Sequence, residues 1–181
     1  MRGTDIGPHL LRHRCELMTD TTETTTLGAT ALVTAETDAS MRTLGKRISG
    51  LLRPGDLLIM SGPLGAGKTT LTQGIAEGLN VRGPITSPTF VIARVHPSLD
   101  GGPALVHADA YRLGSAAEVD DLDLDASLAD SVTIVEWGEG VAEELSDDRL
   151  EISIDRLPND ARTVRLTGIG PRWADVVLSA D

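Results

Sequence analysis

The clearest chemical signal in the sequence is a run of eight residues, 62–69, which reads GPLGAGKT. This run matches the phosphate-binding loop pattern GxxxxGK[ST] at every defining position. Glycines in such a loop let backbone N–H groups point inward around a chain of phosphates, while Lys68 can reach the β- and γ-phosphates and the Thr69 hydroxyl can bind Mg²⁺. We therefore expect a nucleotide site with contacts from Gly62, Gly65, Ala66, Gly67, Lys68, Thr69 and Thr70.

The segments on either side of the loop have the patterns needed to position such a site. Before it, the apolar run DLLIM at 56–60 is typical of a buried parallel strand. After it, Leu71, Ile75 and Leu79 recur at every fourth position, as on one face of a helix. A strand, a loop and a helix in this order place the helix N-terminus against the phosphates, where its dipole and free N–H groups favour anions.

Hydrolysis of a nucleotide also requires a strand-end carboxylate that holds Mg²⁺ and a group that orients the attacking water. Glu136 follows the apolar run 132–135, and Asp109 follows the run 104–108. Ligands of open α/β sheets collect at the carboxyl ends of the strands, so both positions fit, and we expect Glu136 and Asp109 to be catalytic. Each alone is equally compatible with a solvated loop position. A histidine placed like His107 is more often packed or capping than catalytic, and no zinc-ligand spacing surrounds it.

The remaining pattern predicts an α/β fold. A helix is expected to begin with Thr37 or Asp38 as N-cap and to end at the Pro-Gly pair 54–55. The segments 150–154 and 163–167 alternate apolar and polar residues, as half-exposed strands do. Together with the phosphate loop, these elements predict a three-layer P-loop NTPase-like fold with a mixed β-sheet.

The first part of the chain lacks the apolar period of the rest. Residues 1–36 show no steady spacing of apolar side chains, and 19–26 is a polar tract of Thr, Asp and Glu. We expect residues 1–36 to form a disordered N-terminal extension and residues 37–181 to form one P-loop domain.

The composition limits the partners and the compartment. The formal net charge is −11, which disfavours tight unaided binding of nucleic acid because phosphate contacts are made mostly by Lys and Arg. The single cysteine, Cys15, excludes an intramolecular disulfide and fits a reducing compartment. No apolar run reaches the ~18 residues of a membrane span, and no apolar segment of a signal peptide follows the first arginines. We expect a cytoplasmic protein without a membrane partner.

Four motifs together make the chain resemble a known family. GAGKTTL at 65–71, SPTF at 87–90, HADAYRL at 107–113 and VEW at 135–137 occur in the order and at about the spacing of the TsaE family, also called YjeE. These small bacterial ATPases are needed to form the threonylcarbamoyl group on adenosine 37 of tRNAs that read ANN codons. The resemblance implies ATP and Mg²⁺ as cofactors and a TsaB–TsaD-type complex as the partner, which performs the transfer. Because the net charge disfavours unaided tRNA binding, we expect the partner to contact the tRNA as well.

The resemblance also implies roles for individual residues. Thr69 and Glu136 would bind Mg²⁺, and Asp109 would support the metal or the attacking water. Residues 87–89 would act as a switch near the γ-phosphate, which adds Thr89 to the nucleotide contacts. Trp137 would lie near the nucleotide.

Two further positions bear on the resemblance. The start of the first helix, near Asp38, would help to close the adenine pocket. The family usually has Asp after the first glycine of the loop, whereas this chain has Pro63, which removes one N–H and one carboxylate.

Two alternative functions are compatible with the same loop. A small-molecule P-loop kinase would need an arginine-rich lid, which the sequence does not show beyond Tyr111 and Arg112, and a phosphotransfer assay would identify it. A nucleotide-gated binding protein with little catalysis would show slow turnover. A GTPase is disfavoured because no NKxD guanine motif occurs.

Overall fold

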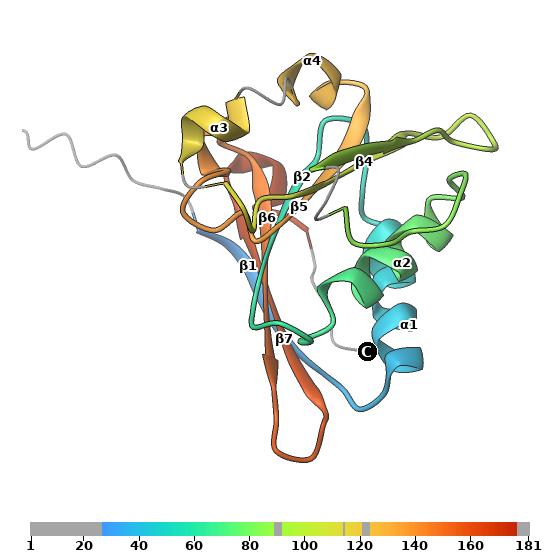
Figure 1. Cartoon of the computed structure of the whole chain (residues 1–181), viewed down its shortest axis with the longest axis vertical. Helices are drawn as coiled ribbons and strands as arrows, with labels where there is room; N and C mark the ends of the chain where they lie inside the picture. Colours follow the sequence, from blue (N-terminus) through green and yellow to red (C-terminus); the bar gives the residue numbers. More distant parts are fainter. Residues whose placement is uncertain (1–26, 89–91, 114, 121–123, 177–181) are drawn as a thin grey trace, which may run out of the picture.

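The computed structural model describes residues 27–88, 92–113, 115–120 and 124–176 (Figure 1). In these residues seven strands form one sheet, in the spatial order β1, β7, β6, β2, β5, β4, β3. In chain order they are β1 (Leu27–Ala35), β2 (Leu57–Ser61), β3 (Ala93–His96), β4 (Ala104–Asp109), β5 (Ser131–Glu136), β6 (Arg149–Arg156) and β7 (Arg162–Ile169).

The centre of the sheet is parallel and its edges are antiparallel. β2 pairs in parallel with β5 and β6, and β5 pairs in parallel with β4. β7 runs antiparallel to β6 and β1, and β3 runs antiparallel to β4. The carboxyl ends of β2, β5 and β4 therefore meet at one end of the sheet, where the register places Met60 and Asp109 on either side of Glu136.

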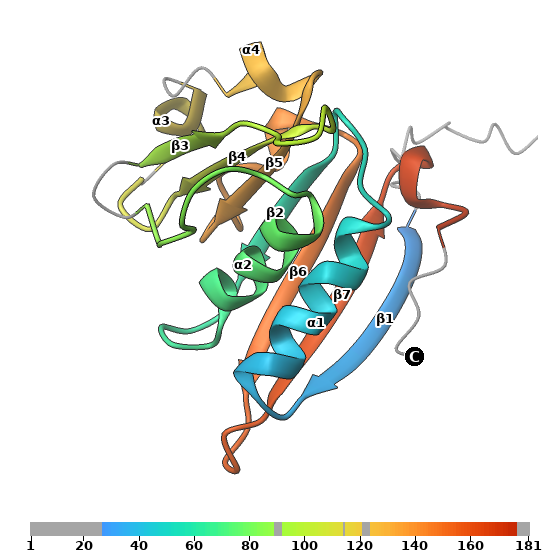
Figure 2. The same cartoon turned by 90° about the vertical axis from the view of Figure 1, so that its right-hand side faces the viewer.

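Helical segments cover both faces of this sheet. α1 (Asp38–Ser49) and α2 (Lys68–Gly78) lie side by side on one face, over the larger apolar core (Figure 2). On the other face, α3 (Ala116–Asp120) and the 3₁₀ turn η1 (Glu143–Leu145) accompany a smaller apolar cluster, and α4 (Asp125–Leu128) precedes β5. The predicted three-layer fold with a mixed sheet is confirmed. Among the described residues, no helix has the length and apolarity to cross a membrane.

Of the two N-cap candidates for α1, the structure selects Thr37. Its hydroxyl accepts a hydrogen bond from the Ser40 N–H at 3.0 Å, and the Ser40 hydroxyl accepts one from the Thr37 N–H at 2.9 Å. This reciprocal pair satisfies two N–H groups that a helix start leaves without partners.

The contact between α1 and α2 is made by backbone rather than by large side chains. A Cβ at Gly45 would stand 2.5 Å from the Leu71 carbonyl oxygen, and one at Gly74 would collide with the Arg42 carbonyl oxygen. Arg42 and Lys46 of α1 also bind the Glu77 carboxylate of α2, at 3.0 and 2.8 Å. The two helices therefore form one unit behind the phosphate loop.

The expected N-terminal boundary is wrong for part of the segment. Residues 27–35, assigned to the disordered extension, form β1, which pairs with β7 along most of its length. Ala31 and Ala35 face the core, whereas Leu32 on the opposite face is 53 % exposed. The segment gave no clear strand pattern because its core-facing side chains are small and threonines lie between them. The partner of β1, β7, lies at the other end of the chain. Residues 1–26 lie outside the described residues.

The C-terminal turn η2 (Pro171–Trp173) is fixed to the start of β2. The Arg172 guanidinium binds both oxygens of the Asp56 carboxylate, at 2.9 and 2.8 Å, and Asp56 is only 3 % exposed. Trp173, at 0 % exposure, belongs to the larger core. This clamp holds the turn that leads into the phosphate-loop strand.

Candidate nucleotide-binding site

The loop between β2 and α2 has the backbone conformation that its glycines predict. Gly62, Gly65 and Gly67 have φ angles of 135°, 76° and 109°, a region that other L-residues rarely adopt. A Cβ at Gly62 would also collide with the Ile154 carbonyl oxygen of β6. Gly67 is the N-cap of α2 and supplies no side-chain cap, so the first N–H groups of the helix remain available to an anion.

Lys68 is held inside the loop. Its ammonium donates hydrogen bonds to the carbonyl oxygens of Gly62 at 2.6 Å and Pro63 at 3.2 Å. It also lies 3.5 Å from the centroid of the Trp137 ring, as a cation–π pair. Burial lowers the pKa of Lys68, while the carboxylates of Glu136 and Asp109 act in the opposite direction.

Trp137 is brought to this position by an unusual backbone conformation. Its φ angle of 60° lies in the left-handed region, at a cost on the order of 1–3 kcal/mol for a non-glycine residue. Its N–H donates to the Met60 carbonyl oxygen at 2.7 Å, which ties it to the end of β2. The Tyr111 ring packs against it, with the ring centroids 5.0 Å apart. The two rings therefore form an aromatic wall beside the loop.

Glu136 ends β5 directly opposite the start of α2. The Thr69 hydroxyl lies 3.1 Å from each carboxylate oxygen of Glu136. Thr72 reaches Oε1 at 3.4 Å, and His107 Nε2 reaches the same oxygen at 2.8 Å. Glu136 is 2 % exposed, so this carboxylate is buried and surrounded by donors. The two residues expected to bind Mg²⁺, Thr69 and Glu136, are thus in direct contact.

Asp109 ends the neighbouring strand, β4, at the same level of the sheet. Its Oδ2 accepts a hydrogen bond from the Ser87 hydroxyl at 2.9 Å, and its Oδ1 accepts one from the Tyr111 N–H at 2.9 Å. Ser87 begins the segment 87–89 that was expected to act as a switch, so this segment contacts a strand-end carboxylate. Thr89 lies outside the described residues.

Most of these groups line one cleft of about 460 Å³, a volume in the usual range for small-ligand sites. Its described lining consists of Asp38, Leu64, Gly65, Gly67, Lys68, Thr69, Thr70, Ser87, Asp109, Tyr111, Glu136, Trp137 and Arg162. Two of the predicted nucleotide contacts, Gly62 and Ala66, belong to the phosphate loop but are not among the described residues that line the cleft.

The sequence prediction missed Arg162, which enters the cleft from the start of β7. Its Nη2 lies 3.1 Å from the Asp38 carboxylate, and a Cβ at Gly67 would stand 3.9 Å from its Nε. That Nε is buried without a hydrogen-bond partner among the described residues. No local motif marks Arg162, because the pairing of β7 with β6 and β1, both distant from the loop in sequence, brings it beside the loop.

The oxygen ligands at the end of the sheet suit a nucleotide that carries Mg²⁺. Mg²⁺ prefers oxygen ligands and is usually held by one or two carboxylates together with substrate phosphates, rather than by a cage of protein side chains. Glu136 and Thr69 supply such oxygens, and no group of three or more His, Cys, Asp or Glu side chains in the described residues forms a rival metal site. The phosphate loop stands directly beside this pair.

Comparisons with known proteins identify relatives of this chain. A protein from Streptomyces coelicolor named tRNA threonylcarbamoyladenosine biosynthesis protein TsaE is 62 % identical over 144 residues, covering 77 % of this chain and 97 % of the relative. The protein of the same name from Bacillus subtilis is 39 % identical over 133 residues, covering 73 % and 82 %. The crystal structure of Bacillus subtilis YdiB superposes with a TM-score of 0.66 at 30 % identity, covering 80 % of this chain and 89 % of YdiB, which supports the P-loop NTPase-like fold.

The family comparison covers the whole phosphate-loop region. A profile described as "Threonylcarbamoyl adenosine biosynthesis protein TsaE" matches residues 35–164, from the end of β1 into β7. This range contains each strand that contributes a strand-end carboxylate as well as the loop. The chain belongs to the TsaE family.

Proposed function

We propose that this protein is a Mg²⁺-dependent ATPase required to form the threonylcarbamoyl group on adenosine 37 of tRNAs that read ANN codons, and that it acts with a TsaB–TsaD-type complex. The relatives named above carry the name of this tRNA modification. The observation that carries the ATPase proposal is the meeting of Lys68, Thr69 and Glu136 in one cleft beside a phosphate loop.

Lys68 and the loop backbone would bind the phosphates. The ammonium is bonded to the Gly62 and Pro63 carbonyl oxygens and is ready to exchange these neutral acceptors for charged phosphate oxygens. Burial makes the exchange favourable, because a partly desolvated cation interacts more strongly with an anion than a hydrated one does. The N–H groups at the start of α2 add to this attraction.

Thr69 and Glu136 would hold Mg²⁺. A bound Mg²⁺ would supply positive charge that stabilises the phosphate oxygens during phosphoryl transfer to water. Asp109 would orient the attacking water, since its two oxygens are fixed by Ser87 and by the Tyr111 N–H. These roles assign the strand-end carboxylates different tasks in one reaction.

The partner would supply an additional positive charge near the γ-phosphate. Two cations line the described part of the cleft, Lys68 and Arg162, and Arg162 is paired with Asp38. An added positive charge at the γ-phosphate is worth about 10³–10⁵ in rate in related phosphoryl-transfer enzymes. A net charge of −11 disfavours unaided tRNA binding, so the partner would also make the tRNA contact. We therefore expect slow hydrolysis by the isolated protein and faster hydrolysis in the complex.

The test is ATP turnover measured with and without the cognate TsaB–TsaD-type proteins and with and without tRNA, with K68A as the inactive control. Partner-dependent acceleration together with threonylcarbamoyl transfer supports the proposal. Fast turnover that is indifferent to partners would instead indicate a stand-alone nucleotidase or kinase. Nucleotide binding without turnover under all conditions would indicate a nucleotide-gated binding protein.

A further inference from the structure

The histidine of β4, His107, contacts the carboxylate that is proposed to bind Mg²⁺. His107 is completely buried, at 0 % exposure, and its Nε2 lies 2.8 Å from Glu136 Oε1. We propose that His107 is a positioning residue for the metal-binding carboxylate: it fixes one oxygen of Glu136, so that the carboxylate keeps one orientation toward Thr69 and the cleft. The inference rests on the proposed magnesium-dependent function and deepens it.

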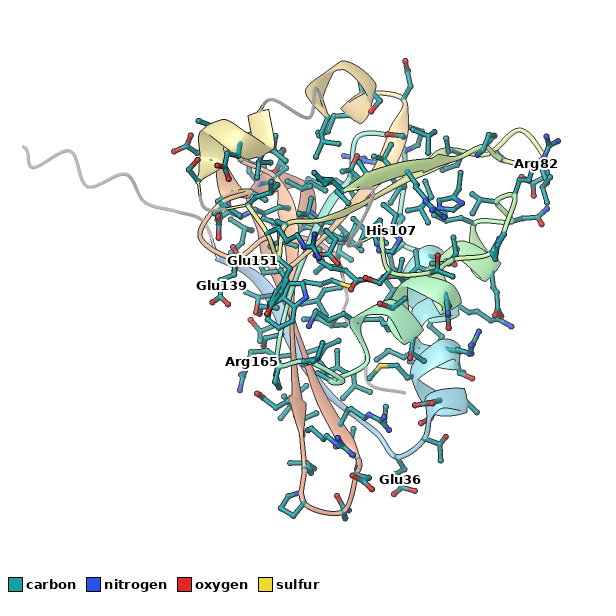
Figure 3. All side chains as sticks on the ribbon, in the orientation of Figure 1. Glu36, Arg82, His107, Glu139, Glu151 and Arg165 are labelled. Carbon is teal, nitrogen blue, oxygen red and sulfur yellow. The ribbon has the colours of Figure 1, made fainter. Side chains whose placement is uncertain are left out.

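The register of the sheet explains why this contact forms. β4 and β5 are parallel, with Asp109 opposite Glu136, so these two side chains lie on the same side of the sheet. His107 is two residues before Asp109 and therefore faces that side as well. That side carries α2, which begins at Lys68. Figure 3 shows His107 inside the molecule, between the central strands and α2. The alternation of the strands therefore places His107, Asp109 and Glu136 on the same face of the sheet, where His107 reaches Glu136.

The hydrogen bonds of Glu136 show what His107 adds. Oε1 accepts from His107 at 2.8 Å, from Thr69 at 3.1 Å and from Thr72 at 3.4 Å, whereas Oε2 accepts from Thr69 at 3.1 Å. The histidine bond is the shortest, and it comes from a ring with few rotamers rather than from a rotating hydroxyl. An ionised carboxylate only accepts, so Nε2 carries the proton in this bond.

The other ring nitrogen argues against a simple packing role. His107 Nδ1 is buried and has no hydrogen-bond partner in the described part of the chain. Burying a polar group without a partner is unfavourable, so an apolar ring at this place would suit packing better. What distinguishes histidine from phenylalanine here is the single donor toward Glu136. Outer partners of metal-binding side chains commonly change metal affinity by about 10–100-fold when removed.

The experiment compares H107F, which keeps ring volume without a donor, with H107Q, whose amide nitrogen restores a donor near the position of Nε2. The readouts are ADP binding by calorimetry with and without Mg²⁺, and the Mg²⁺ concentration that gives half-maximal ATP turnover. We expect H107F to raise that concentration about 10-fold or more with metal-free ADP binding unchanged, and H107Q to stay closer to the wild type.

T133V is the matched control. Thr133 is also fully buried in the sheet, in β5, and its hydroxyl has no partner among the described residues, so this nearly isosteric change should leave the Mg²⁺ requirement unchanged. A folded H107F protein with wild-type Mg²⁺ dependence would overturn the inference, as would an H107Q protein that loses as much as H107F, or equal losses of ADP binding with and without metal. A wild-type protein without any Mg²⁺ dependence would refute the proposed function itself, before any variant is compared.

Discussion

Replacing Glu136 by glutamine removes the charge of the side chain while nearly keeping its shape. In E136Q the new amide would retain one oxygen as acceptor for His107 Nε2, which lies 2.8 Å from the carboxylate in the wild type. The amide nitrogen would face Thr69, whose hydroxyl can accept a hydrogen bond as well as donate one. Because each neighbour keeps a partner, we expect the free energy of unfolding to change by no more than ~1–2 kcal/mol.

The loss of function should be much larger than the loss of stability. Glu136 is the carboxylate in contact with Thr69, and it is 2 % exposed, so its charge acts in a poorly screened environment. Charge stabilisation by a bound metal is worth several kcal/mol in the transition state, and each ~1.4 kcal/mol corresponds to a tenfold change in rate. We therefore expect E136Q to lower partner-stimulated kcat on the order of 100-fold or more.

The assay is ATP turnover in the presence of saturating partner proteins, with denaturant unfolding of the same E136Q sample. D109N is the matched comparison, because Asp109 ends the neighbouring strand opposite Glu136. If E136Q turns over ATP at the wild-type rate while D109N does not, Asp109 is the metal carboxylate and Glu136 is a structural strand end. A large fall in the stability of E136Q would show that the hydrogen-bond argument is wrong.

Other variants test the loop and the elements behind it. K68A should abolish productive ATP binding, since it removes the point charge at the phosphates, and near wild-type affinity in a titration would contradict this. T69A should weaken ADP binding with Mg²⁺ more than without it; equal losses in calorimetry would reduce Thr69 to a helix-terminus residue. G74A should cost about 1–3 kcal/mol or more in urea unfolding, because its methyl group would meet the Arg42 carbonyl, and an unchanged midpoint would contradict that contact. R172L should cost about 3–5 kcal/mol by leaving the buried Asp56 carboxylate unpaired, and a loss below ~1 kcal/mol would contradict the buried ion pair.

The parts of the site that could be predicted from sequence are those set by local structure. The phosphate loop, the buried strand before it and the helix after it are adjacent in the chain, so their spacing carries the geometry directly. Glu136 and Asp109 were found because the carboxyl ends of parallel strands meet at one end of a sheet. Their contacts follow from strand order, which places β5 between β2 and β4.

The parts that could not be predicted depend on pairings between distant segments or on the backbone of a single residue. The contact of His107 with Glu136 was not predicted, since a strand pattern alone does not say which strand lies beside it in the sheet. The left-handed backbone of Trp137, which turns its ring toward Lys68, has no signature in the residue type. The close contact of α1 with α2 depends on glycines that the apolar spacing of each helix does not include.

The edge strand β1 shows how a segment with a weak pattern can determine the geometry of the cleft. β1 leads into α1, so its end fixes where Asp38 stands, and its register places Ala35 opposite Arg162 at the start of β7. This pairing brings the Asp38 carboxylate within 3.1 Å of Arg162 Nη2, beside Gly67 of the phosphate loop. Because successive side chains of a strand alternate between the two faces, a slip of β1 by one position would turn Ala31 and Ala35 away from the core and move Asp38 relative to Arg162. The ion pair of the cleft cation Arg162 with Asp38 therefore depends on a strand that the sequence pattern assigned to a disordered extension.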